Sequence, residues 1–188
     1  MPTNILFTGR AYYSLENCLV NDTGNGMEIT SVIIGLYEER IYRVDYHILT
    51  NPHWETGRVE ITCRHGNTTD TLRLESEGKG NWLLNGLAAP QFDGCMDIDV
   101  PLTPFTNTLP IRKLNLHDGQ SQEIQVIYCD LLNRTTGCVR QQYTRLSATR
   151  YHYQNVPNDF EATITVDEQG LVVDYPGLFV RTAVLRGS

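Results

Sequence analysis

Short runs in which apolar and polar side chains alternate recur along almost the whole chain. In the run 42–48, tyrosine, valine and isoleucine occupy the even positions, while Arg43, Asp45 and His47 occupy the odd ones. Successive side chains of a β-strand point to opposite faces, so this alternation predicts a strand with one buried face. The pattern recurs at 59–63, 72–74, 82–84, 124–128, 160–166 and 171–175. The sequence therefore predicts an all-β fold.

Turn-forming segments separate these runs, and they are rich in glycine, asparagine and aspartate. Because these residues readily adopt the backbone angles of tight turns, hairpins are expected to join the strands into a long antiparallel sheet. Such a sheet must protect its edges, and curling into a barrel or roll would create a concave face. One short helix is predicted, with Thr103 as N-cap, Pro104 at the first helical position and Pro110 as the residue that ends it.

Length and charge limit the classes of function. A chain of 188 residues is long enough for one core, so a single domain over 1–188 is expected. The net charge is −7 and no run of lysines or arginines occurs, which argues against nucleic acid as a partner. No secretion signal and no segment long enough for a transmembrane helix is found, so a cytoplasmic protein is predicted.

Cysteine and histidine patterns predict neither a metal site nor a cofactor. The five cysteines contain no C-x-x-C pair, and the five histidines are scattered singly. All five thiols are expected to be reduced in a reducing compartment. The common catalytic motifs, including the nucleophile elbow and the phosphate-binding loop, are absent.

The sharpest local feature is the acidic run 93–99. If it is extended, Asp93, Cys95, Asp97 and Asp99 share one face. Three interpretations are open: a cation site, a general acid/base pair, or a solvated or arginine-paired outer face. The run lacks the ligand spacing of a calcium loop, which favours the third. We expect Arg112 to form the ion pair with one or more of the three aspartates.

Two further groups could recognise a polar ligand. The segment 103–114 is dense in hydroxyl and amide groups, although these could equally cap a helix and satisfy loop amides. Near the C-terminus, Gln141, Tyr143 and Arg145 share one parity, and Asp174 and Tyr175 precede a Pro-Gly turn. Tyrosines suit sugar or lipid head groups, but along strands they more often pack the sheet.

These motifs together resemble the bacterial putative glycolipid-binding proteins, formerly a domain of unknown function. The resemblance covers roughly residues 10–182 and rests on Tyr42-x-Val44 and on the segments 54–56, 80–82, 93–99, 103–112, 142–144 and 167–179. Lys113 departs from the family pattern, which usually has an arginine there. The resemblance implies a spiral β-roll, a long curved antiparallel sheet wrapped around one α-helix.

The leading hypothesis is a non-enzymatic protein that binds an amphipathic ligand, a glycolipid or another lipid, in the concavity of the roll. The residues expected at the polar head group are Asp97, Asp99, Asn107, Arg112, Gln141, Tyr143, Arg145, Asp174 and Tyr175. One alternative is an enzyme that uses the aspartates and Arg112 on a sugar or ester. Another is a self-associating structural protein, since exposed sheet edges make a homodimer plausible.

Overall fold

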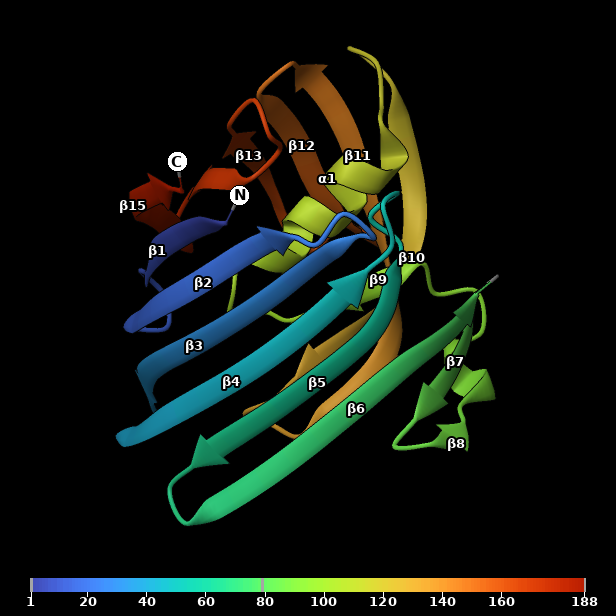
Figure 1. Ribbon diagram of the computed structural model, residues 1–188. Helices are drawn as coiled ribbons and strands as arrows, with labels where there is room; N and C mark the ends of the chain where they lie inside the picture. Colours follow the sequence, from blue (N-terminus) through green and yellow to red (C-terminus); the bar gives the residue numbers. More distant parts are fainter. Residues whose placement is uncertain (1, 79, 188) are drawn as a thin grey trace.

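The computed structural model describes residues 2–78 and 80–187, and its strands form one continuous sheet of 15 strands (Figure 1). One arm of the sheet contains β1 (Thr3–Gly9), β2 (Ser14–Asp22), β3 (Met27–Tyr37), β4 (Arg40–Thr50), β5 (Thr56–His65), β6 (Thr68–Gly78), β7 (Asn81–Leu84) and β8 (Leu87–Ala88). The other arm contains β9 (Asp97–Asp99), β10 (Ser121–Asp130), β11 (Thr135–Ser147), β12 (Arg150–Val156), β13 (Glu161–Val166), β14 (Val172–Tyr175) and β15 (Phe179–Arg186). The all-β prediction is confirmed.

The two arms join where β1 pairs with β15, so the ends of the chain lie side by side within the sheet (Figure 1). Neighbouring strands are antiparallel, apart from β9, which runs parallel to β10. The sheet curves until its two edge strands, β8 and β9, are linked by residues 89–96. In this link, the Gly94 N–H donates to Gly80 O at 3.0 Å and the Met96 N–H to Gln125 O at 2.7 Å. The long curved antiparallel sheet expected from the sequence is therefore present, and it does not close into a barrel.

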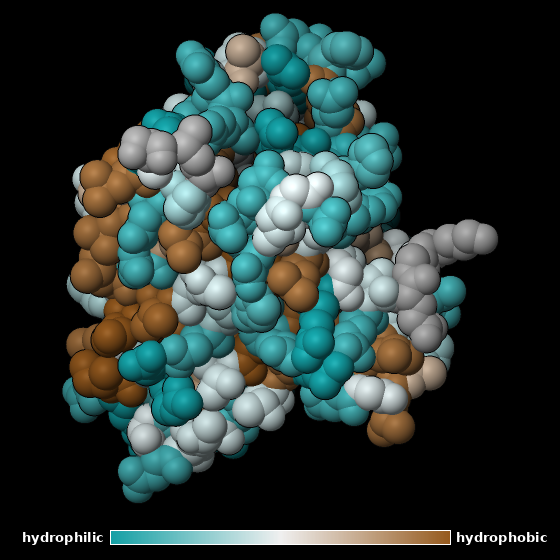
Figure 2. Space-filling model, in the orientation of Figure 1, coloured by the Kyte–Doolittle hydropathy of each residue, from teal (hydrophilic) through white to brown (hydrophobic). Residues whose placement is uncertain are grey.

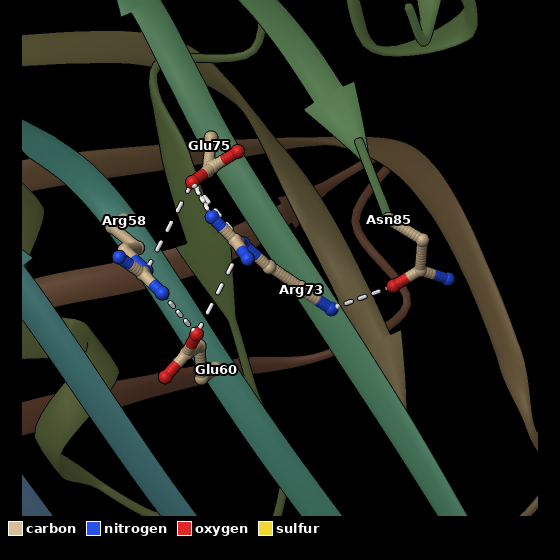
Figure 3. A network of polar contacts seen from close by, with 5 residues as sticks. All are labelled: Arg58, Glu60, Arg73, Glu75 and Asn85. Carbon is tan, nitrogen blue, oxygen red and sulfur yellow. Dashed lines mark hydrogen bonds and ion pairs between the residues drawn. The ribbon is translucent and has the colours of Figure 1, made fainter. Parts of the chain in front are cut away.

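The alternation along the strands sorts side chains between the two faces of the sheet, as expected. On β4, Tyr42, Val44 and Ile48 are buried, whereas the outer face carries charged groups. Figure 3 shows such a group on the outer face of β5 and β6. There Arg58 lies 2.5 Å from Glu60, and Arg73 pairs with Glu75. The Arg73 backbone N–H also donates to the Asn85 side chain at 3.0 Å, which ties the start of the turn after β7 to β6.

The interior of the roll is filled by β9 and the segment that follows it. Ile98, Val100, Leu102, Phe105 and Leu109 are each no more than 2% exposed. This segment contains the 3₁₀-helix η2 (Phe105–Asn107) and the helix α1 (Thr108–Leu114), which lies between the two arms of the sheet in Figure 1. A second 3₁₀ turn, η1 (Pro90–Phe92), lies in the link between the edge strands. The roll is therefore packed along its axis.

The expected bounds of the helix were wrong. The α-helix begins at Thr108, so Pro110 lies in its first turn instead of ending it. A backbone N–H has no intrahelical partner in the first turn, and proline is therefore tolerated there. The helix ends at Leu114, and its C-cap Asn115 has a left-handed φ of 44°. The Thr103 hydroxyl accepts a bond from the Phe105 N–H at 3.0 Å, so it supports the 3₁₀ turn that precedes the helix.

Candidate functional site

The acidic run does not form one extended face. Asp93 is exposed after η1, and Gly94 has a φ of 85°, so the chain turns before β9 begins. Cys95 is buried on the inner side of this turn, and its sulfur lies 3.1 Å from that of the exposed Cys138. All five cysteines are free thiols. The two aspartates that remain in the interior, Asp97 and Asp99, have different partners.

Asp97 is fully buried and is paired with Lys113, not with Arg112. The Lys113 Nζ lies 2.8 Å from Asp97 Oδ2, and the Thr56 hydroxyl donates to Oδ1. Burial raises the pKa of Asp97, although the charge of Lys113 and its hydrogen bond act in the opposite direction. The predicted ion pair of Arg112 was therefore wrong, and the neighbouring residue in the helix takes that role.

Arg112 instead lies over the ring of Trp54, with its guanidinium carbon 5.3 Å from the ring centroid. Gly170 packs against its stem so closely that a Cβ there would lie 2.6 Å from Arg112 Cδ. Two open cavities of about 670 and 500 Å³ meet at Arg112 and Trp54. Arg145 lines the smaller of the two, and its guanidinium donates to Leu116 O at 2.7 Å and pairs with Asp118 at 2.9 Å. These two arginines thus belong to the end of the roll near the C-terminus of α1.

Asp99 belongs to a different group, which lies near the start of the helical segment. It is half-buried and accepts hydrogen bonds from the Gln141 amide at 2.7 Å and from the Thr106 hydroxyl at 3.2 Å. Burial raises the pKa of Asp99, and both hydrogen bonds act against this shift. In the same region, the Tyr143 hydroxyl donates to Asn107 Oδ1 at 2.9 Å. Four of the predicted residues, Asp99, Asn107, Gln141 and Tyr143, are thus brought together.

A cavity of about 220 Å³ opens beside this group, and we call it the aromatic pocket. Its polar lining comes from Asp99, Thr103, Asn107 and Asn155, and Pro101 and Leu178 complete it. Six rings surround these groups, from Tyr12, Tyr128, Tyr153, Phe160, Tyr175 and Phe179. The rings pack on one another: the centroids of Tyr153 and Tyr175 are 6.1 Å apart, and Tyr12 stacks on Phe179 at 6.0 Å.

Exposure separates the floor of the aromatic pocket from its rim. Tyr153, Tyr175 and Phe179 are at most 5% exposed and form the floor with Thr103 and Asn107. The half-buried side chains of Tyr12, Asn155, Phe160 and Leu178 form the rim. The predicted residue Tyr175 therefore lies in the pocket. Its predicted neighbour Asp174 faces away and pairs with Arg10 at 3.1 Å.

Glu16 is a buried acid that the sequence analysis missed. It is 2% exposed, and Oε1 accepts hydrogen bonds from Ser31 at 2.8 Å, Tyr46 at 2.6 Å and Thr103 at 2.9 Å. Burial raises the pKa of Glu16 to about 7, against the effect of these hydrogen bonds. The alternation along β2 could have revealed its burial, because Glu16 lies on the same inner face as Cys18 and Val20. Thr103 connects this acid to the floor of the aromatic pocket.

No group of three or more histidine, cysteine, aspartate or glutamate side chains is placed to hold a metal ion within 2–78 and 80–187. Within the same ranges, no helix has the length and apolar character needed to cross a membrane.

The chain is similar to proteins of one family over most of its length. A family model described as putative glycolipid-binding matches residues 8–181. The crystal structure of a DUF1089 family protein from Pseudomonas aeruginosa is 38% identical in sequence and superposes with a TM-score of 0.82. That match covers 89% of this chain and 91% of the other. No curated protein matches the chain. The segment matched by the family model contains every residue that lines the aromatic pocket.

Proposed function

Because the chain belongs to the putative glycolipid-binding family, we propose that it binds an amphipathic molecule, such as a glycolipid, without acting on it chemically. The polar part of the ligand enters the aromatic pocket, and its apolar part contacts the rings and Leu178 at the rim. The observation that carries this proposal is the combination of six rings with the polar groups of Asp99, Thr103, Asn107 and Asn155 in one cavity. Small-molecule sites typically combine an apolar wall with a few convergent polar groups in this way.

The size of the cavities supports a binding mode that differs from the one expected from the sequence. The axis of the roll is packed with side chains, so an acyl chain is not expected to thread through it. A pocket of about 220 Å³ is smaller than the sites that enclose whole drug-sized ligands. We therefore assign the head group alone to the aromatic pocket and leave the chain of the ligand at the rim.

The arrangement of carboxylates favours binding over hydrolysis. Among the described residues that line the aromatic pocket, Asp99 is the one carboxylate. Most glycosidases use two carboxyl groups that flank the scissile bond. Asp97, the other aspartate of β9, is already paired with Lys113 and hydrogen-bonded to Thr56. The enzyme hypothesis based on the aspartates and Arg112 is further weakened because Arg112 lines different cavities.

Blocking the rim of the aromatic pocket tests the proposed site. Leu178→Trp adds a large ring at a half-buried rim position, so uptake of n-octyl-β-D-glucoside should fall by at least about tenfold in affinity, measured by calorimetric titration. The matched control is Leu185→Trp, since Leu185 is 73% exposed on β15 and does not line the pocket. Equal binding by both variants and the wild type would move the site elsewhere, and the cavities at Arg112 would be the next place to test.

A further inference from the structure

The two aspartates of β9 differ in their partners: Asp97 has a cationic partner, whereas the partners of Asp99 are neutral. Lys113 lies 2.8 Å from Asp97. The hydrogen-bond donors of Asp99, Gln141 and Thr106, are both neutral. Among the described residues that line the aromatic pocket, none is a lysine, arginine or histidine. A carboxylate removed from water is costly to keep ionised unless a cation compensates it, so Asp99 lacks a counter-ion that the fold supplies to Asp97.

The rings of the pocket are suited to supply the remaining surface of a cation site. The face of an aromatic ring attracts a cation, and cages of several rings bind quaternary ammonium groups. Six rings line the pocket, and four of them belong to tyrosines: Tyr12, Tyr128, Tyr153 and Tyr175. The negative charge of Asp99 contributes to the raised pKa of each of these four tyrosines, after burial, which is the main cause. Asp99 lines the same cavity as these rings, so a cation held there would lie near both the carboxylate and the rings.

These observations also argue against one class of head group in the aromatic pocket. A phosphate or carboxylate would meet Asp99 without any basic side chain to compensate it, because the described lining contains none. Like charges brought together in this way discriminate strongly against the wrong ligand. The volume of about 220 Å³ is large enough for a compact head group.

We propose that the aromatic pocket binds an alkylammonium group, with Asp99 as its counter-ion and the surrounding rings as its cage. This inference deepens the proposed function, since it names the chemical class of the head group that enters the same pocket. The amphipathic ligand is therefore cationic at the end that enters the protein, as in an amine-bearing or quaternary ammonium lipid.

A pair of probes with the same shape tests this assignment on the wild-type protein. Choline and 3,3-dimethylbutan-1-ol differ mainly in the charge on the trimethyl centre. We expect choline to bind at least about tenfold more tightly in calorimetric titrations at neutral pH and low salt. Equal affinity for the two probes, or no binding of choline, would overturn the assignment.

Two variants test whether Asp99 causes the preference for choline over its neutral analogue. Asp99→Asn should abolish the difference between the probes, whereas Asp45→Asn, which removes the same charge on the outer face beside Arg43 and Arg64, should keep it. A preference that survives in folded Asp99→Asn would also overturn the assignment. If Asp99→Asn fails to fold, Tyr175→Leu is the second variant. It replaces one ring by an apolar side chain, and it should weaken the binding of choline more than the binding of its neutral analogue.

Binding of n-octyl-β-D-glucoside and of choline to the same wild-type protein distinguishes the amphiphile site from the cation site. Binding of n-octyl-β-D-glucoside without binding of choline would keep the amphiphile site and reject the cation site. Binding of choline without uptake of any amphiphile would keep the cation site and reject the amphiphile function.

Discussion

At the scale of single residues, Glu16 shows how burial without a cation couples the fold to pH. Three hydroxyl groups donate to its Oε1, and no partner is found for Oε2 among the described residues. Burial raises the pKa of Glu16 from 4.5 to about 7, so the folded protein keeps this proton in a range where the unfolded chain loses it. The contribution of Glu16 to stability is therefore greatest at or below pH 4.5 and falls as the pH rises towards 7.

Glu16→Gln should remove this pH dependence, because the amide stays neutral at every pH. Relative to the wild type, the free energy of unfolding of the variant should increase by on the order of 3 kcal/mol between pH 4.5 and pH 8. Urea denaturation of both proteins at several pH values measures the difference. Glu123→Gln, at an exposed position of β10, is the control and should not reproduce the slope. A constant difference between Glu16→Gln and the wild type would contradict the account.

At the scale of elements, the rotation of α1 decides which basic residue neutralises the interior. Successive residues of an α-helix point about 100° apart, so Arg112 and Lys113 face different surroundings. Lys113 points towards β9, where it also donates to Met96 O at 2.8 Å, and its side chain is 12% exposed. Arg112 points towards Trp54 and the open cavities.

Lys113→Met should therefore destabilise the protein far more than Arg112→Met. The first change leaves the Asp97 carboxylate buried without a cation, which costs on the order of 3–5 kcal/mol. The second removes a contact between the exposed Arg112 and the ring of Trp54, which is worth about 1 kcal/mol. Chemical denaturation measures both values, and Asp97→Asn should partly restore the Lys113→Met variant. A larger loss of stability in Arg112→Met than in Lys113→Met would contradict this account and favour Arg112 as the ion-pair partner of Asp97.

The strands were predictable from the sequence, whereas the helix bounds and the partners of Asp97 were not. The strands were predictable because their period of two follows from the backbone and is repeated in each run, such as Tyr42 to Ile48. The helix was placed too early because Pro110 was interpreted as its end, while a first-turn proline has the same sequence signal. The partners of Asp97 were not predictable, since a one-residue difference in helix rotation selects Lys113 over Arg112.

At the scale of the whole molecule, the roll brings residues together that no local pattern connects. Tyr12, Asp99 and Tyr175 meet in the aromatic pocket although they come from opposite ends and the middle of the chain. Glu16 was overlooked because its side chain is polar, and the partners that bury it, such as Tyr46 and Thr103, lie far away in the sequence. The sequence predicted four members of the group around Asp99, but the cavity beside them and the rings of Tyr12, Tyr128, Tyr153 and Phe160 emerged only from the structure.

The homodimer expected from the sequence remains a prediction. The outer face of the roll carries an exposed apolar patch that could form its interface. Figure 2 shows hydrophobic atoms gathered along the left side of the molecule, over the ends of β2 and β3. Leu15 and Ile34 are cross-strand partners there, as are Leu36 and Ile41, and each is at least 42% exposed. Exposed apolar patches of this kind often mark association surfaces. We expect any dimer to use this face, which leaves the aromatic pocket in the interior of the roll free.

Native mass spectrometry of the protein purified without detergent tests the central claim most directly, namely that the fold holds an amphipathic ligand. The account predicts a species heavier than the 21.3 kDa chain by the mass of one small lipid, or by one amphiphile when a cationic lipid is added. Leu178→Trp should lose this adduct and Leu185→Trp should keep it, and the same spectrum distinguishes one chain from two. A bare chain that takes up no member of a broad panel of neutral and cationic amphiphiles would contradict the account.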